Sequence, residues 1–144
     1  MSIIIKKLKV FFAKKENKLF VGSPVEKKVI ENAEKQLNVK FDKDYKEFMT
    51  YFGGSYVGFP IYAFNNCKML SDETVVDLTL DFRKTYLANN RFPIIQESYV
   101  ISISGNGDPI IIRPDGKIEI YYHDNDKKEI LAESFILLLK TMID

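Results

Sequence analysis

The chain has 144 residues, which is near the usual size of one globular domain and too short for two, so we expect a single domain over residues 1–144. Hydrophobic residues make up 46% and charged residues 28% of the sequence, which excludes disordered and fibrous proteins. The formal net charge is +1 and arginine occurs only at Arg83, Arg91 and Arg113, which argues against nucleic-acid binding.

The first predicted helix starts near Ile4. Its apolar positions, Ile4, Leu8, Phe11 and Phe12, recur at helical spacing, and lysines lie between and after them. A basic amphipathic helix of this kind lies either on a membrane surface or on the protein's own core. We favour the core, because that is much the commoner use.

A proline-containing cap precedes the second predicted helix. Ser23 and Glu26 are spaced as a Ser-x-x-Glu capping box, and Pro24 occupies the first helical position. The apolar face then recurs every four residues, at Val25, Val29, Ala33 and Leu37. The pattern therefore predicts a helix that starts at Pro24 and buries this face.

The third predicted helix follows Asp42, a residue type that is favoured as an N-cap. A dense apolar stripe runs along it, at Tyr45, Phe48, Met49 and Phe52. Gly53 and Gly54 then end the helix. We expect the second and third helices to stack on each other.

The segment from residue 56 to residue 64 is rich in aromatic side chains. It also contains Gly58 and Pro60, which weaken a central strand but are tolerated at the edge of a sheet. We therefore predict a short strand or an edge segment here.

The fourth predicted helix begins at a cap formed by Ser71 or Asp72 and ends near Asn89. Four apolar side chains share one of its faces, namely Val75, Leu78, Phe82 and Tyr86. We expect this face to pack on the rest of the domain.

β-Branched residues dominate the sequence after Pro93. The predicted strands are residues 94–95, 100–104, 109–113 and 117–122, and turn sequences at 104–108 and 114–116 connect the last three. Such short connections predict an antiparallel meander. A last helix closes the chain, with apolar residues at Leu131, Phe135, Leu138 and Met142.

The order of these elements predicts the fold class. Helices come first, strands second and one helix last, whereas a parallel sheet would need alternating strands and helices. We therefore expect an α+β domain in which helices pack on a mainly antiparallel sheet, with a meander in the second half.

Cysteine usage and the N-terminal residues indicate a compartment. Cys67 is the single cysteine, so it has no intramolecular disulfide partner, which favours a reducing compartment. Lys6, Lys7 and Lys9 interrupt the apolar N-terminus where a signal peptide needs an unbroken apolar core. No stretch is long and apolar enough to span a bilayer. We expect a cytoplasmic protein that does not bind membranes.

Candidate catalytic and metal-binding groups are few. His123 is the only histidine, and Cys67 lies beside asparagines without a cysteine-protease signature. Residues 124–126 resemble the start of a calcium loop, but Glu129 and Phe135 replace the required glycine and glutamate. We therefore expect no catalytic residues, no metal and no cofactor.

One enzymatic alternative stays open, namely a small-molecule or nucleotide-binding enzyme that uses His123 and nearby aspartates. It requires His123 to line a pocket together with at least two of Asp108, Asp124 and Asp126. The sequence does not show whether these side chains face one pocket.

Tyrosines and turn aspartates suggest where a partner protein binds. Tyrosine is favoured at interfaces because it buries a large ring and keeps its hydroxyl wet. Acidic turns would form a local acidic face of the kind that inhibitors of basic nucleases use. The alternative is that these are half-buried sheet residues and ordinary turns. The predicted partner-binding residues are Tyr56, Tyr62, Tyr99, Asp108, Asp115, Tyr121, His123, Asp124 and Asp126.

Several motifs together resemble the SUKH superfamily. Pro24 is followed by Ile30-x-x-Ala33-Glu34-x-x-Leu37, Asp44-Tyr45-Lys46-Glu47-Phe48 and Tyr51-Phe52-Gly53-Gly54. The second half contains Gly105-Asn106-Gly107-Asp108, Asp115-Gly116, Tyr122-His123-Asp124 and Leu131-Ala132-Glu133-Ser134-Phe135. The order and spacing of these motifs carry the resemblance, which covers the chain from Pro24 onward.

The resemblance implies an α+β fold and, for a bacterial member, neutralisation of a cognate polymorphic toxin by direct binding. A nuclease domain is one candidate toxin. The superfamily also includes fungal cell-wall synthesis regulators, so a regulatory scaffold is the alternative. The chain departs from the family pattern at Phe41-Asp42, where Leu-Pro is common, and in having no tryptophan.

Overall fold

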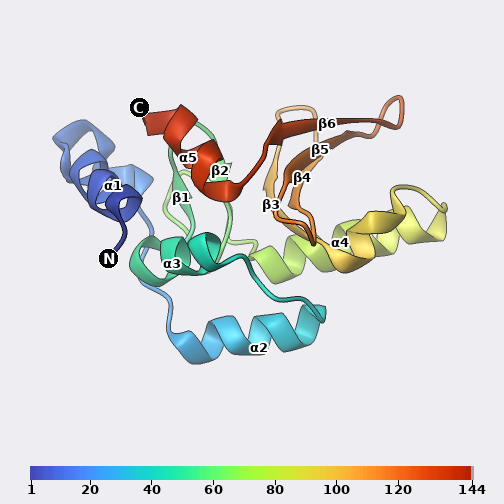
Figure 1. Cartoon of the computed structure of the whole chain (residues 1–144), viewed down its shortest axis with the longest axis horizontal. Helices are drawn as coiled ribbons and strands as arrows, with labels where there is room; N and C mark the ends of the chain where they lie inside the picture. Colours follow the sequence, from blue (N-terminus) through green and yellow to red (C-terminus); the bar gives the residue numbers. More distant parts are fainter. Residues whose placement is uncertain (144) are drawn as a thin grey trace.

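The computed structural model describes residues 1–143 and has the α+β architecture that was predicted (Figure 1). Its helical elements are α1 (Ile3–Ala13), η1 (Lys15–Phe20), α2 (Lys27–Leu37), α3 (Lys43–Phe52), α4 (Val75–Ala88), η2 (Pro93–Glu97) and α5 (Phe135–Ile143), where η denotes a 3-10 helix. Its strands are β1 (Ser55–Tyr56), β2 (Pro60–Ile61), β3 (Tyr99–Ile103), β4 (Pro109–Ile112), β5 (Ile118–Tyr122) and β6 (Lys127–Ala132). Strands β3 to β6 form an antiparallel meander in sequence order.

Strands β3, β4 and β5 bury side chains on both faces of the sheet, because side chains alternate between the faces along each strand, whereas β6 at the edge is largely exposed. One face contributes residues such as Ile101, Ile112 and Ile120 to a large hydrophobic cluster with α1, α2, α3 and α5. The other face contributes Val100 and Ile111 to a smaller cluster with α4 and η2. Figure 1 shows α4 running along one side of the sheet, while α3 and α5 lie beside it.

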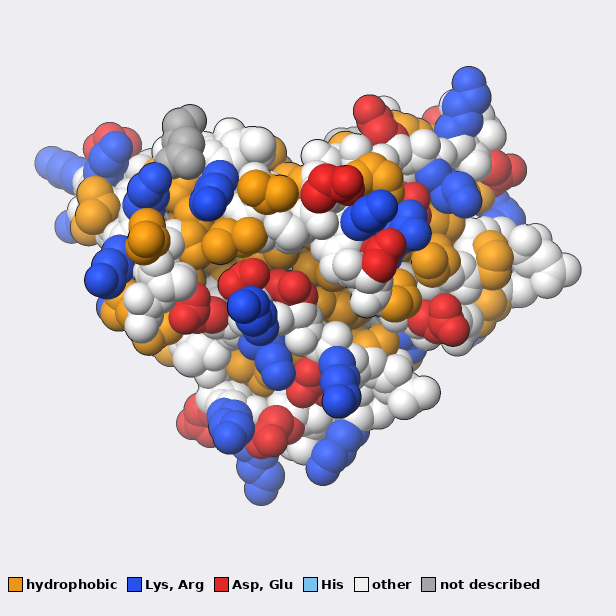
Figure 2. All heavy atoms as spheres, viewed as in Figure 1, with side chains coloured by type: hydrophobic (Ala, Val, Ile, Leu, Met, Phe, Trp, Pro, Cys, Tyr) orange, Lys and Arg blue, Asp and Glu red, His pale blue; other side chains and the backbone are white. Residues whose placement is uncertain are grey.

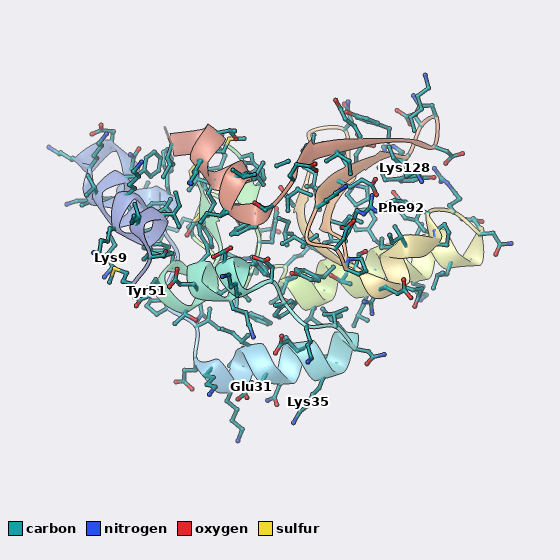
Figure 3. All side chains as sticks on the ribbon, in the orientation of Figure 1. Lys9, Glu31, Lys35, Tyr51, Phe92 and Lys128 are labelled. Carbon is teal, nitrogen blue, oxygen red and sulfur yellow. The ribbon has the colours of Figure 1, made fainter. Side chains whose placement is uncertain are left out.

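Helices α1 and α3 form as predicted. The buried residues of α1 include Ile4, Leu8 and Phe12, so this basic helix packs on the protein's own core. In α3 the Asp42 carboxylate accepts hydrogen bonds from the backbone N–H groups of the first turn, and the predicted apolar stripe is buried. Lys9 of α1 also lies over the ring of Tyr51 of α3, 5.1 Å from its centroid (Figure 3).

Helix α2 begins later than predicted, at Lys27, and Glu26 rather than Ser23 is its N-cap. The preceding segment is held extended by long-range hydrogen bonds, from Ser23 N–H to the Asn65 carbonyl at 3.0 Å and from Val25 N–H to the Met49 carbonyl at 3.2 Å. These contacts leave the local capping box unformed. The buried face of the helix consists of Ile30, Ala33 and Leu37, and the predicted face residue Val29 is exposed.

The segment before α4 differs from the prediction in two ways. Residues 55–61 form a two-stranded hairpin rather than one strand. Helix α4 is capped by Thr74, whose hydroxyl forms a capping box with Asp77, and not by Ser71 or Asp72. The Asn66 side chain donates to the carbonyls of Ser71 and Glu73, which keeps these residues out of the helix.

Three of the predicted strands correspond to β3, β4 and β5, while residues 94–95 belong to the 3-10 helix η2. The sixth strand was missed, because the predicted last helix included Leu131, which lies in β6. The last helix begins instead at Phe135, and the Ser134 hydroxyl accepts a hydrogen bond from the Leu137 N–H. Within residues 1–143, each helix falls short of the length and apolarity needed to cross a bilayer.

Candidate functional site

Two turns at one end of the sheet bring together several predicted partner-binding residues. We call residues 104–108 and 123–126 the turn end of the sheet. Asp108 closes the β3–β4 turn, and His123, Asp124 and Asp126 belong to the β5–β6 turn, with Tyr121 just before it. The two turns lie side by side because β4 and β5 are adjacent antiparallel strands.

The remaining predicted partner-binding residues lie elsewhere. Asp115 is in the β4–β5 turn at the opposite end of the sheet, where it pairs with Arg113 at 3.1 Å. Tyr56 packs against Phe20, and Tyr62 is half-buried beside the α4 cluster. Tyr99 is only 3% exposed, and its hydroxyl accepts a hydrogen bond from the Asp42 N–H at 2.7 Å. Tyr99 therefore acts as a core residue.

Asp108 connects the two turns through its buried carboxylate. One oxygen accepts hydrogen bonds from the His123 backbone N–H at 3.0 Å and lies 2.5 Å from the His123 ring Nδ1. The other oxygen accepts from the Ser104 hydroxyl at 3.0 Å. The Nε2 atom of His123 lies 3.1 Å from the Asp124 carboxylate, so both ring nitrogens face carboxylates.

The protonation of Asp108 follows from these contacts. Burial alone would raise the pKa of this carboxyl, but the hydrogen bonds from His123 and Ser104 outweigh burial and lower its pKa below the ordinary value. The charged form of Asp108 is therefore the form that these contacts stabilise. It holds the two turns in one geometry.

Arg91 fastens the same hairpin to the end of α4. Its Nε donates to the Tyr121 hydroxyl at 3.1 Å and to the Asp126 carboxylate at 3.0 Å, and its Nη2 donates to the His123 carbonyl. The guanidinium also lies over the rings of Tyr86 and Tyr121, at 5.2 and 5.5 Å from their centroids. Hydrogen bonds from Tyr121 and then Arg91 lower the pKa of Asp126.

Phe92, the residue after Arg91, also contacts the β5–β6 hairpin. Its ring stacks on Tyr121 with centroids 4.4 Å apart and an interplanar angle of 15°. Figure 3 shows it between the α4–β3 connection and the sheet. Its φ of 45° is uncommon for a bulky residue, and the ring stack compensates for this strained backbone. Burial also raises the pKa of the adjacent Tyr86 to about 12.

A cavity of about 390 Å³ lies between α4 and the turn end of the sheet. Leu78, Phe82 and Tyr86 of α4 line one side, and Ile103, Gly107 and His123 line the other. Gly107 has a φ of 85°, a value that other residue types rarely adopt, so the turn at this wall depends on glycine. The cavity has an apolar floor and a polar rim, which is the usual composition of a binding pocket.

The enzymatic alternative requires His123 to line a pocket together with at least two of the three nearby aspartates. His123 lines this cavity, whereas Asp108, Asp124 and Asp126 are not among its lining residues. Cys67 is buried, and its backbone N–H donates to the Gly54 carbonyl at 2.8 Å. Over the same residues, His, Cys, Asp and Glu side chains do not gather into a group that could hold a metal ion.

Sequence reasoning missed the α4 side of the site. From the sequence, Arg91 was considered only as one of three arginines, and no role was predicted for Phe92. The one local signal was the pair Asn89-Asn90, which ends α4 and releases the chain toward the sheet. The contacts of Arg91 and Phe92 join residues about 30 positions apart in the sequence, so no local pattern reports them.

Comparison with known proteins identifies a family whose model matches this chain. A family model described as SUKH_5, SMI1-KNR4 cell-wall, matches residues 1–144. No curated protein matches the chain. The match spans both halves of the molecule, including α4 and the two turns.

Proposed function

Because this chain belongs to the SUKH_5 (SMI1-KNR4 cell-wall) family over its whole length, we propose that it is an immunity protein that neutralises a cognate toxin by direct binding. In this proposal the protein is not an enzyme, needs no cofactor and acts in the cytoplasm. Its partner is a protein, for which a nuclease domain of a polymorphic toxin is one candidate.

The observation that carries the proposal is the hydrogen-bonded turn end of the sheet. Asp108 ties one turn to the other, and Arg91 ties the second turn to α4. A surface that is already held in one conformation loses little entropy when it binds, which favours tight association. The adjoining cavity, whose lining includes Phe82 and Tyr86, has the make-up of a protein-binding hot spot.

Charge also favours this surface as the contact. Asp124 and Asp126 expose 81% and 66% of their side chains at the turn end. An exposed acidic face speeds association with a basic partner and selects for it, although the net charge of the whole chain is near zero. Local acidic turns would supply the complementarity that the net charge does not.

The test is co-expression with a toxin domain encoded next to this chain. We expect the wild-type protein to restore growth and to co-purify with the toxin in a stable complex. Persistent toxicity together with the absence of a complex would refute the proposal.

A charge-reversal variant tests whether the turn end contacts the toxin. We expect Asp124→Lys to weaken the complex about tenfold, because it replaces attraction by repulsion at the turn end. Glu31→Lys is the matched control, since Glu31 points away from the molecule on α2, where acidic and basic side chains are mixed (Figures 2 and 3). Equal affinities for both variants would exclude the turn end as the contact.

A regulatory scaffold is the second candidate, and the cell-wall description of the matching family favours it. This function would use the same binding surface without a toxin. A gene neighbourhood without any toxin, together with affinity purification that returns regulatory proteins of the host, would support it over immunity. Capture of a toxin domain would contradict it.

A further inference from the structure

The cavity between α4 and the turn end carries two acidic side chains that the proposed function has not used. Glu73, just before α4, and Asp81, one turn and a half into it, both line the cavity. Both residues are exposed, and they lie on the α4 side of the rim. They face the same space as the apolar floor.

These two carboxylates lack positive partners. Within residues 1–143, no lysine, arginine or histidine nitrogen lies within 4.0 Å of either of them, and the Glu73 carboxylate accepts only a 3.2 Å hydrogen bond from the Ser71 hydroxyl. The Asp81 carboxylate accepts no hydrogen bond from the described chain. Both negative charges are therefore available to a ligand.

The Arg91 and His123 side chains at the cavity already have acidic partners. Arg91 is paired with Asp126 at 2.9 Å, and the ring of His123 lies between Asp108 and Asp124. An anionic ligand would meet a guanidinium whose Nε and Nη2 are engaged, and it would also approach Glu73 and Asp81. The balance of charge at the rim is negative, so it favours a cation.

The floor adds a second requirement. Leu78, Phe82 and Ile103 offer apolar surface below the acidic rim, and Leu78 is only 2% exposed. A small hydrated ion would gain nothing from this surface. A side chain with an aliphatic stem and a charged head would bury its stem there and keep its head at the rim.

We infer that this cavity receives a lysine or arginine side chain from the protein partner. The stem lies on Leu78, Phe82 and Ile103, and the cationic head pairs with Glu73 and Asp81. This inference rests on the proposed function for the identity of the partner, but the cavity can be tested without it. It makes the α4 rim, and not the turns alone, part of the contact.

The first test uses small probes on the isolated full-length chain. Blocked arginine, N-acetyl-arginine methylamide, and the corresponding blocked lysine are titrated to tens of millimolar while backbone amide NMR shifts are followed. We expect saturable shifts at Asp81, Phe82 and Gly107. The neutral citrulline analogue serves as the control for arginine, because it keeps the shape and removes the charge.

Two conservative variants test whether the NMR shifts arise from binding at the acidic rim of the cavity. Glu73→Gln and Asp81→Asn should each weaken binding of both cationic probes about two- to fivefold, which is the range expected for exposed ion pairs. Glu31→Gln on α2 is the matched control and should leave binding unchanged. Binding of citrulline as tight as that of arginine, or shifts confined to other surfaces, would overturn the inference.

The second test separates this inference from the proposed function. If the toxin binds the wild-type chain and binds the Glu73→Gln/Asp81→Asn double variant with equal affinity, the cavity inference fails and the immunity proposal stands. If no toxin binds the wild-type chain but the cationic probes bind at the rim, the immunity proposal fails and the cavity keeps its specificity. A loss of toxin affinity of about tenfold in the double variant supports both.

Discussion

The two faces of the four-stranded sheet are stabilised in different ways. On the face toward α3 and α5, rings pack edge to face, with Phe135 against Tyr45 at 5.4 Å and against Phe48 at 5.7 Å. On the face toward α4 the hydrophobic cluster is smaller, and two arginines, Arg83 and Arg91, join the elements by hydrogen bonds. The first face supplies most of the packing, and the second leaves a cavity.

This difference indicates how a small protein can hold a packed core and still keep a cavity at its surface. Apolar packing at full density leaves no room for a ligand. Directional hydrogen bonds from arginine can fix the position of α4 without filling the space beside it. The cavity therefore lies on the face that is held by polar contacts.

The largest expected effect is on the α3 and α5 face. Phe135→Ala removes a fully buried ring, and we expect it to lower the free energy of unfolding by about 3–5 kcal/mol, since the loss combines transfer free energy with a new cavity. Urea denaturation followed by circular dichroism measures this. Phe82→Ala, on the half-buried α4 side, is the comparison and should cost less. Equal losses would mean that the two faces do not differ as described.

On the α4 face the strongest test is Arg83. Its guanidinium donates to the carbonyls of Leu37, Ile95 and Ser98 at 2.9–3.0 Å, so it joins the end of α2 to η2 and the start of β3. We expect Arg83→Met, which keeps most of the stem, to cost about 2–3 kcal/mol, because charge-assisted hydrogen bonds are lost. Arg83→Lys should recover only part of this, because a lysine cannot reach three separate carbonyls. A loss below about 0.5 kcal/mol in urea denaturation would contradict this role.

The turn end predicts a pH dependence. Asp108 has a lowered pKa in the folded protein, so its contribution to stability is present above the ordinary carboxyl pKa and is lost as the pH falls through the lowered value. We expect Asp108→Asn to cost about 1–2 kcal/mol at pH 7 through weakened hydrogen bonds. The difference from wild type should shrink as the pH falls below about 4. A difference that stays constant down to pH 2, measured by urea denaturation at each pH, would show that the charge of Asp108 is not what matters.

The smallest effect is expected at the start of α4. Thr74→Ala removes the hydroxyl that accepts from the Asp77 N–H at 3.1 Å, and we expect it to cost about 1 kcal/mol. Thr74→Ser keeps the cap and should stay close to wild type. Thermal denaturation of the three proteins checks this. If alanine and serine behave alike, the capping box contributes nothing to the stability of the α4 face.

The sequence predicted those elements whose signals are local. Asp42, the stripe beginning at Tyr45 and the stop at Gly53 specify α3 from contacts within one helix. The predicted capping box at Ser23 failed because Val25 and Ser23 form backbone hydrogen bonds with distant carbonyls, which outweigh a local cap. Local signals therefore hold where no tertiary contact competes with them.

One part of the candidate site also follows from local signals, and the other part depends on tertiary contacts. The turns at Asp108 and His123 were predicted because turn residues are local signals, and the meander brings them together. The cavity depends on where α4 crosses the sheet and on the positive φ of Phe92, and neither is encoded in a short pattern. Tyr99 was among the predicted partner-binding residues, because a sequence does not show which tyrosine hydroxyl accepts a hydrogen bond from a backbone N–H group in the core.

Strand β6, which sequence patterns missed, also bears on how copies of this protein behave toward one another. It ends the sheet, it is exposed along nearly its whole length, and it begins with Lys127 and Lys128. Its pairing with β5 shifts register between Ile118 and Glu119, which leaves Leu131 without an opposite residue. Charge and irregular pairing both oppose the addition of a strand from a second molecule. The features that hid this strand from pattern analysis are thus the ones that resist aggregation through the open edge of the sheet.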